Sequence, residues 1–336
     1  MAVRVGINGF GRIGRDILRS TIERDDTVIE IVAVNDLTTP DTLAHLLAYD
    51  STYGPWKHAV AAEGNTLTVD HRSIAVTAEP DPAKLDWGSL GVDVVIEATG
   101  RFRTRDTAAM HLTSGARKVL ITAPGKGIDA TIVMGVNDDD YIPELHDVVS
   151  NASCTTNCAA PMAWVLNECF GIESGLMTTI HSYTNDQSLL DGPHKDLRRA
   201  RSAAVNMIPT STGAARAIGQ VIPALDGKLD GLSVRVPLED GSLTDLTVLL
   251  KSHTTAAQVN RAFAEAADGR FKGILRYTTD PLVSRDIIGD PSSCVFDSSL
   301  TKANGRLVKV FGWYDNEWGY ANRTIDLTEM IANTLP

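Results

Sequence analysis

The sequence predicts an α/β protein that combines a Rossmann-type, doubly wound parallel sheet with an α+β region built on a mostly antiparallel sheet. Three observations lead to this prediction. The first hundred residues alternate short β-branched runs with helical patterns, as βαβ units do. Beyond residue 150 the strands become longer and are joined by turn signals, which favours antiparallel pairing. The length of 336 residues corresponds to about two domains.

In the first half, residues 3–8 and 28–34 are buried-strand patterns that flank a helical pattern over residues 12–23. A strand, a helix and a strand within so short a span form a βαβ unit, so the two strands are expected to be parallel. The other elements expected here are a hairpin over 65–69 and 73–76, strands over 92–97, 118–122 and 131–136, and a helix over 104–114.

In the second half, a helix is expected from residue 154 to 170, ended by Gly171. Strands are expected over 175–180, 231–237, 243–250, 294–297 and 306–313, with helices over 255–267 and 317–334. The link Glu239-Asp240-Gly241 predicts a hairpin between strands 231–237 and 243–250.

Composition excludes several classes of protein. The formal net charge is −11, which argues against a general nucleic-acid binder because such proteins need a basic surface. Four cysteines are too few for a disulfide scaffold. The N-terminal residues lack the uninterrupted apolar stretch of a signal peptide, and no run is apolar enough to span a membrane. We therefore expect a soluble protein of a reducing compartment with no membrane partner.

The first sharp motif is Gly9-Phe10-Gly11-Arg12-Ile13-Gly14, which lies between a predicted strand and a predicted helix. Gly9 permits a tight turn, Gly11 lets the backbone approach a pyrophosphate, and Gly14 lets the helix pack on the strand. Asp36 ends the second strand, where a carboxylate accepts hydrogen bonds from ribose hydroxyls and repels a 2′-phosphate. The motif predicts NAD rather than NADP; the alternative is a glycine-rich turn that binds no cofactor.

The second motif is the run 150–158, SNASCTTNC, at the expected start of a helix. A helix N-terminus stabilises a thiolate and a nearby imidazole is expected to lower the thiol pKa, so Cys154 is the candidate nucleophile. His181 is its candidate partner, because it ends a strand before a polar loop. The other seven histidines are expected at the surface. Cys158 is interpreted as structural, and no metal is expected because no second ligand pair follows.

Six motifs together make the whole chain resemble the phosphorylating glyceraldehyde-3-phosphate dehydrogenase family. They are NGFGRIGR (8–15), SCTTN (153–157), HSYTNDQ (181–187), KDLRRAR (195–201), PTSTGAA (209–215) and WYDNEWGY (313–320). The resemblance implies that Cys154 attacks the aldehyde of glyceraldehyde 3-phosphate. Hydride then passes to NAD, and inorganic phosphate releases an acyl phosphate from the thioester. In that family the histidine, here His181, activates the thiol and stabilises the oxyanion.

The resemblance also implies the binding residues. The substrate phosphate maps onto Thr184 and Arg235, and the incoming phosphate onto Ser153, Thr155, Thr212 and Gly213. Arg199 lies in the loop that approaches these phosphates. The alternative interpretation of the basic run 195–201 is a solvent-exposed basic surface with no ligand. For NAD the match adds Arg12, Ile13, Thr122 and Asn316. Asn316 has the alternative role of a helix cap.

At the level of the whole protein, the resemblance implies a cytoplasmic homotetramer with loop 195–201 at a subunit interface. It implies an NAD-binding domain of residues 1–152 plus 317–336 and a catalytic domain of residues 153–316. The chain departs from the pattern of the family at three sites. Pro80 stands where many relatives have an arginine beside the adenine, and Gly192 stands where an apolar residue is common. The pair Ala159-Ala160 stands where a larger aliphatic residue often lies. The two alanines enlarge the space behind the nucleophile, which suggests the hypothesis that this enzyme is a variant with altered sensitivity to thiol-directed inhibitors.

Two other functions remain as alternatives. Erythrose-4-phosphate dehydrogenase shares the fold and the nucleophile, but its relatives tend to lose the loop 183–185 and the motif 210–213, both intact here. A non-enzymatic NAD-binding protein would not need Cys154 and His181 together.

Overall fold

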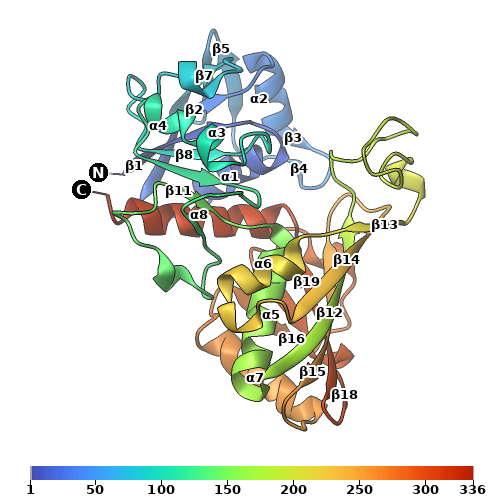
Figure 1. Cartoon of the computed structure of the whole chain (residues 1–336). Coiled ribbons are helices and arrows are strands. Elements are labelled where there is room, and N and C mark those ends of the chain that lie inside the picture. The colour runs from blue at the N-terminus through green and yellow to red at the C-terminus, as the bar shows by residue number, and fades with distance from the viewer. Residues whose placement is uncertain (1, 336) are drawn as a thin grey trace. The chain divides into compact units, whose positions relative to one another are not determined.

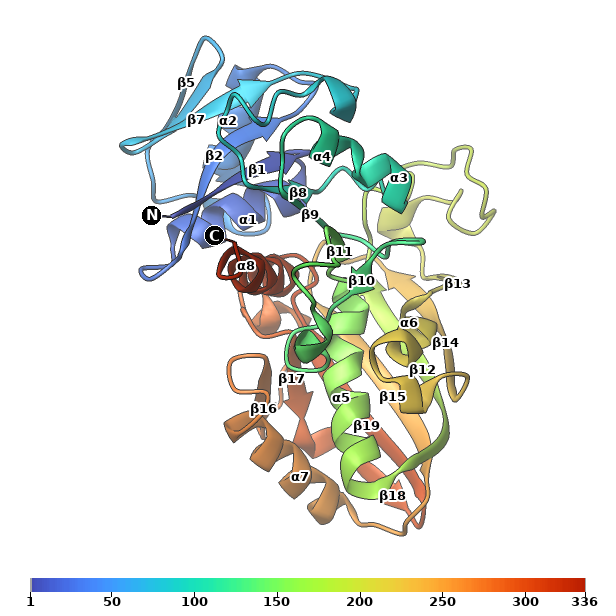
Figure 2. The same ribbon diagram turned by 60° about the vertical axis from the view of Figure 1, so that its left-hand side comes forward.

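The computed structural model describes residues 2–335 and divides the chain into two compact units. Residues 1–132, 139–152 and 321–336 form the first unit, and residues 133–138 and 153–320 form the second. Each unit contains its own sheet (Figures 1 and 2).

The first unit is built on a nine-stranded sheet with the order β10-β11-β9-β8-β1-β2-β7-β6-β5. Its strands are β1 (Val3–Asn8), β2 (Ile29–Asn35), β5 (Val60–Glu63), β6 (Thr66–Val69), β7 (Arg72–Thr77), β8 (Val94–Glu97), β9 (Lys118–Ile121), β10 (Ala130–Thr131) and β11 (Val148–Ser150). All pairings from β10 to β7 are parallel, and β5 and β6 add an antiparallel edge. The predicted doubly wound sheet is confirmed.

Helices surround this sheet in the way that parallel strands require. They are α1 (Arg12–Ile22), α2 (Pro40–Ala48), the short α3 (Arg105–Ala108) and α4 (Met110–Thr113), and residues 321–332 of α8 (Trp318–Ala332). A small ladder of β3 (Tyr49–Asp50) and β4 (Gly54–Pro55) follows α2. Helix α8 lies beside α1, where the Ser20 hydroxyl donates to Asn322 at 2.9 Å (Figure 2).

The second unit is an eight-stranded mixed sheet in which antiparallel pairings predominate. Its strands are β12 (Ile172–Ser182), β13 (Ile208–Ser211), β14 (Leu229–Val236), β15 (Ser242–Leu250), β16 (Leu275–Thr278), β17 (Cys294–Asp297), β18 (Lys302–Asn304) and β19 (Leu307–Tyr314). Helices α5 (Cys154–Phe170), α6 (Ala214–Val221) and α7 (Ala256–Asp268) accompany the sheet (Figure 1).

Helix α5 has the boundaries that its sequence predicts. Ser153 caps it, with a hydroxyl that accepts from the Thr156 backbone N–H at 3.1 Å. Gly171 ends it with a φ of +68°, a conformation that glycine adopts without strain. Cys154 is therefore the first residue of the helix, where backbone N–H groups lack intrahelical partners.

Three element predictions are wrong. Strands β14 and β15 do not pair, because β12 inserts between them, parallel to β14 and antiparallel to β15. The expected strand 131–136 ends at Thr131, since the chain turns at Gly135, where φ is +78°, and the Val133 N–H bonds to the Asn137 side chain. The expected helix 104–114 divides at Ala109 into α3 and α4.

Candidate functional site

The glycine-rich turn after β1 has the shape that a dinucleotide requires. Gly9 adopts a φ of +94°, and a Cβ there would lie 2.7 Å from the Thr99 nitrogen. A Cβ on Gly14 would lie 2.3 Å from the Gly9 carbonyl oxygen, so α1 packs on the turn only because residue 14 lacks a side chain. A Cβ on Gly11 would meet no atom within 4 Å, which leaves the backbone there open to a ligand.

A cavity of about 290 Å³ opens above this turn. It is lined by Asn8, Gly9, Gly11, Asn35, Asp36, Leu37, Glu79, Pro80, Ala98, Thr99, Arg101 and Phe102. The Asp36 carboxylate accepts from the Phe10 N–H at 2.9 Å and the Thr38 N–H at 3.2 Å, which fixes it at the rim of the turn. The open glycine, the start of α1 and this carboxylate fit a dinucleotide.

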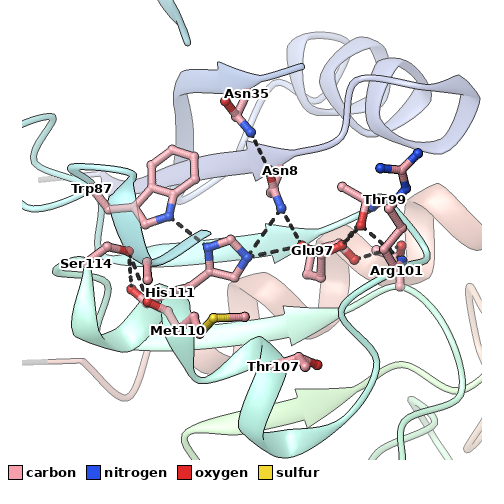
Figure 3. Close-up of polar contacts among 12 residues, drawn as sticks. Asn8, Asn35, Trp87, Glu97, Thr99, Arg101, Thr107, Met110, His111 and Ser114 are labelled. Atoms are coloured by element: carbon pink, nitrogen blue, oxygen red, sulfur yellow. Dashed lines mark hydrogen bonds and ion pairs between the residues drawn. The ribbon is translucent and has the colours of Figure 1, made fainter. Parts of the chain in front are cut away.

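The remaining predicted cofactor residues lie outside the lining of this cavity. Arg12 forms an ion pair with Asp50 at 3.0 Å, and Ile13 follows it on the first turn of α1. Thr122 follows β9, and its hydroxyl donates to the Glu97 carbonyl at 3.1 Å. His111, expected at the surface, is fully buried in α4 and belongs to a polar network beside the cavity (Figure 3).

In the second unit, α5 and β12 bring the predicted nucleophile and base together. The Cys154 Sγ lies 3.5 Å from the His181 Nε2. The His181 Nδ1 lies 2.7 Å from the Ser182 carbonyl oxygen, which can only accept, so Nδ1 carries the proton and Nε2 faces the thiol as an acceptor. This is the tautomer that a general base needs.

Burial dominates the charge states of this pair. It raises the pKa of Cys154 to about 11, although the positive charge of Arg235 and hydrogen bonds from Thr155 act in the opposite direction. Burial, together with Arg235, lowers the pKa of His181 to about 3. The expectation that helix start and imidazole would give a lowered thiol pKa is wrong here, because desolvation of the thiolate outweighs both. The resting pair is a neutral thiol beside a neutral imidazole.

Arg235 supplies the positive charge at this pair. Residues 181 and 235 are register partners on the parallel strands β12 and β14. The Arg235 Nη1 donates to the Ser182 carbonyl and to the Thr184 hydroxyl, each at 3.2 Å. Its Nε is buried and has no acceptor among the described residues, so the guanidinium retains donor capacity for an anion.

Tyr314 is a component of the site that the residue-by-residue reasoning missed. Its hydroxyl lies 2.9 Å from the Thr155 hydroxyl and 2.8 Å from that of Thr179. Its ring meets the His181 ring edge to face, with centroids 6.0 Å apart. The signal was available in the run 313–320, where Tyr314 belongs to a quoted motif.

The predicted anion ligands lie at two helix starts and one loop. Ser153 and Thr155 are at the start of α5, and Thr212 and Gly213 directly precede α6. The Thr155 side chain is buried and engaged with Tyr314. Arg199 donates to Thr210, Asp186 and the Ser211 carbonyl, and its charge helps to lower the pKa of His181.

Asn316 lies two residues before the start of α8, and its side-chain oxygen accepts from the Ser242 hydroxyl at 2.6 Å. Its Nδ2 has no partner among the described residues, so a donor remains for a ligand. The cap of α8 is instead Asp315, whose carboxylate accepts from the N–H groups of Glu317 and Trp318 at 2.9 and 2.7 Å. The alternative role of Asn316 as a cap is thus taken by its neighbour.

Residues 2–335 contain no cluster of three or more His, Cys, Asp or Glu side chains suited to a metal ion. In the same range, no helix is long and apolar enough to cross a membrane.

Comparison with known proteins identifies the family. Residues 3–105 match the family model "Glyceraldehyde 3-phosphate dehydrogenase, NAD binding domain", and residues 153–316 match "Glyceraldehyde 3-phosphate dehydrogenase, C-terminal domain". The chain belongs to the glyceraldehyde 3-phosphate dehydrogenase family. The chain therefore has the fold of this family and uses NAD as its cofactor.

Individual glyceraldehyde 3-phosphate dehydrogenases match over almost the entire chain. The protein is 59% identical over 337 residues to "Glyceraldehyde-3-phosphate dehydrogenase" of Streptomyces coelicolor, with 100% of both chains covered. It is 56% identical over 335 residues to "Glyceraldehyde-3-phosphate dehydrogenase 2" of Streptomyces arenae, again with 100% of both covered. It is 56% identical to the Geobacillus stearothermophilus enzyme over 334 residues, 99% of each chain.

The departures from the glyceraldehyde 3-phosphate dehydrogenase pattern have distinct locations. Pro80 lines the dinucleotide cavity, where it presents an apolar surface instead of a cation. Ala159 and Ala160 are fully buried within α5, one turn beyond the nucleophile. Gly192 lies in the loop between β12 and β13, where its N–H donates to the Ala200 carbonyl.

Proposed function

We propose that this protein oxidises and phosphorylates D-glyceraldehyde 3-phosphate to 1,3-bisphosphoglycerate with NAD and inorganic phosphate, as in glycolysis and gluconeogenesis. The observation that carries the proposal is the 3.5 Å contact between the Cys154 Sγ and the unprotonated Nε2 of His181. A cysteine and a base at this distance form an activated nucleophile. The printed names of the relatives support the same activity.

The first step forms a bond between the Cys154 sulfur and the aldehyde carbon. The thiol proton moves to the His181 Nε2, and the carbonyl oxygen becomes the oxyanion of a thiohemiacetal. Once protonated, Nε2 becomes a donor to that oxyanion. The Cys154 backbone N–H, which has no acceptor among the described residues, is a second donor at the start of α5. One such donor is worth roughly 10²–10³ in rate.

NAD, when bound, supplies the acceptor for the hydride that leaves the thiohemiacetal carbon. Before the hydride leaves, the proton on the His181 Nε2 passes to the oxyanion, which gives a neutral thiohemiacetal hydroxyl and a neutral imidazole. His181 then takes this hydroxyl proton back as the thioester forms on Cys154. A phosphate oxygen then attacks the thioester carbon, the C–S bond breaks, and the thiolate leaves with an acyl phosphate as product. Thiolate suits both roles because it is a strong nucleophile and a good leaving group.

Two anion sites complete the proposed centre. Arg235 and Thr184 would bind the substrate phosphate, since the Arg235 guanidinium keeps a free donor beside the pair. Ser153, Thr155, Thr212 and Gly213 would receive the incoming phosphate at the starts of α5 and α6, with Arg199 in the adjoining loop. Because the Thr155 hydroxyl is engaged by Tyr314, we expect its backbone N–H to be the relevant donor.

For the cofactor, we propose Gly9, Gly11, Arg12, Ile13, Gly14, Asp36, Thr122 and Asn316 as binding residues. The glycine geometry and the fixed Asp36 carboxylate support the first group. The free Nδ2 of Asn316 supports a contact with the nicotinamide carboxamide.

We also propose a cytoplasmic homotetramer with domains 1–152 plus 317–336 and 153–316. Five large apolar side chains in the segment 189–207 are at least 74% exposed: Leu189, Leu190, Leu197, Val205 and Met207. Exposed apolar surface on this scale is typical of a protein interface and supports burial against another subunit.

The test is steady-state NADH formation with and without inorganic phosphate, using glyceraldehyde 3-phosphate and erythrose 4-phosphate in parallel. We expect turnover with the three-carbon substrate to depend on phosphate, and Cys154→Ser to reduce it by several orders of magnitude. Turnover that is unchanged without phosphate would refute the phosphorylating reaction. A preference for erythrose 4-phosphate would favour the alternative dehydrogenase.

A further inference from the structure

Three polar side chains lie side by side where neighbouring parallel strands end next to the dinucleotide cavity. Asn35 ends β2, Asn8 ends β1 and Glu97 ends β8, and the three residues are register partners across the sheet. Asn8 and Asn35 line the cavity, whereas the Glu97 side chain is only 1% exposed. Figure 3 shows these residues joined to one another and to His111.

The proton positions at one end of this row are fixed by a backbone donor. The Glu79 N–H donates to the Asn35 Oδ1 at 2.9 Å, so the Asn35 amide group must point its Nδ2 the other way. That Nδ2 donates to the Asn8 Oδ1 at 2.7 Å. The Asn8 Nδ2 is then left to donate to the Glu97 Oε2 at 2.6 Å.

The other end is fixed by an indole. The Trp87 Nε1 can only donate, and it lies 2.9 Å from the His111 Nδ1. His111 therefore has an unprotonated Nδ1, is neutral, and carries its proton on Nε2. The Nε2 lies 3.1 Å from the Glu97 Oε2, so it is a second donor to the same carboxylate (Figure 3).

Thr99 completes the surroundings of the carboxylate. Its backbone N–H donates to the Glu97 Oε1 at 2.8 Å, and its hydroxyl, which accepts from the Arg101 N–H, donates to the same oxygen. Every partner of Glu97 is placed to donate to it, and all of them except the Thr99 hydroxyl can only donate. In residues 2–335 no lysine or arginine lies within ion-pairing distance of Glu97. Four donors converge on the two carboxylate oxygens, so a negative charge on Glu97 is stabilised by hydrogen bonds alone.

We propose that Glu97 is a specificity-determining residue whose fixed negative charge makes the cofactor site favour NAD over NADH. Reduction removes the positive charge of the nicotinamide ring, so NADH carries one more negative charge than NAD. A buried anion beside the site opposes the reduced form wherever the ring lies, because the sign depends only on that difference in charge. Its repulsion of the two phosphates is the same for both forms and cancels in their ratio.

The size of the effect follows from Coulomb's law. For charges separated by about 10–15 Å at an effective dielectric constant of about 20, the ratio of dissociation constants for NADH and NAD changes by roughly sixfold to seventeenfold. His111 and Trp87 are positioning residues in this scheme, because they keep the imidazole neutral and oriented toward Glu97 without lining the cavity.

The experiment measures dissociation constants of NAD and NADH by calorimetric titration of the full-length protein without aldehyde. We expect Glu97→Gln to lower the NADH-to-NAD ratio of dissociation constants at least about sixfold. Glu97→Asp, which keeps the charge, should preserve the ratio. Loss of a hydrogen bond weakens both nucleotides alike and leaves the ratio unchanged. An unchanged ratio in Glu97→Gln, or an equal change in Glu97→Asp, would overturn the proposal.

A second measurement covers the case in which Glu97→Gln does not fold. Isotope-edited infrared spectra of the wild type, compared with Glu97→Asp to assign the band, report whether this carboxyl is ionised. We expect the band of an ionised carboxylate under the conditions of the calorimetric titration; the band of a protonated carboxyl there would overturn the proposal. The proposal rests on NAD binding, but neither measurement depends on the reaction at Cys154. A failure of this proposal can therefore be distinguished from a failure of the proposed reaction.

Discussion

Two alanine substitutions in the same glycine-rich turn should separate folding from cofactor binding. A Cβ at residue 14 would approach the Gly9 carbonyl oxygen to 2.3 Å and the Ile7 side chain to 3.3 Å. Because the clash is with backbone, forcing α1 away from the strand in this way costs about 3 kcal/mol, the upper end of the usual overpacking range, against a gain in helix propensity of about 1 kcal/mol. Gly14→Ala should therefore lower the free energy of unfolding.

Gly11→Ala is the matched control, because its Cβ meets nothing within 4 Å and its φ of −72° suits alanine. Its stability should stay within about 0.5 kcal/mol of the wild type. The new methyl group lies on the lining of the cavity, where the backbone must approach the pyrophosphate. We expect the dissociation constant of NAD to rise at least about tenfold, equivalent to 1.4 kcal/mol.

Thermal unfolding and calorimetric titration of both variants make the comparison. A loss of 1 kcal/mol should lower the Tm of a unit of this size by about 2–4 °C. The reasoning is refuted if Gly14→Ala is as stable as the wild type, or if Gly11→Ala binds NAD with unchanged affinity.

Two further predictions concern carboxylates. Asp36→Ala should relax discrimination against NADP, because the carboxylate that would repel a 2′-phosphate is gone. The measurement is kcat/KM for NAD and for NADP. A wild-type enzyme that already prefers NADP would contradict this role of Asp36. Burial, with the nearby Asp315 and Glu317, raises the pKa of Asp240 to about 9. Between about pH 4 and pH 9 the folded state therefore holds a proton that the unfolded chain has released. The stabilisation from this proton is complete below pH 4, declines as the pH rises and is absent above about pH 9. The slope of the decline is at most about 1.4 kcal/mol per pH unit. Asp240→Asn should flatten the decline in denaturant-derived stability between pH 7 and 9, and a slope equal to that of the wild type would show that the proton lies elsewhere.

The cofactor turn could be predicted from the sequence because the steric constraints that require glycine there are local. The positive φ of Gly9 is a property of its own backbone, and the close approach at Gly14 is to Gly9 and Ile7, a few positions away, so each demands glycine for a local steric reason. The start of α5 was likewise predictable, since Ser153 caps the helix within three residues of itself.

Non-local pairing was the part that local patterns did not reveal. The turn at residues 239–241 is real, with Gly241 at a φ of +86°, but turn residues carry no information on whether a third strand inserts. His111 was misplaced for a similar reason. Its apolar neighbours Met110 and Leu112 do not show that the imidazole itself is buried, because that burial depends on Trp87 and Glu97 from other parts of the chain.

The charge state of the nucleophile also lay beyond sequence reasoning. Helix start and imidazole are visible as sequence features, but the desolvation that raises the pKa of Cys154 is a property of the folded surroundings. The sequence contains Tyr314 within the motif 313–320, but its contacts with Thr155 and Thr179 join three separate elements and so depend on the fold.

The central claim is that Cys154 carries an acyl group that only phosphate releases efficiently. Rapid mixing of enzyme, NAD and glyceraldehyde 3-phosphate without phosphate, followed by mass spectrometry of the quenched protein, tests it most directly. We predict one burst of NADH per active site and a phosphoglyceroyl group on Cys154, both of which disappear in Cys154→Ser. NADH formation that continues at the full steady rate without phosphate, or an acyl group on Cys158 instead, would contradict the account.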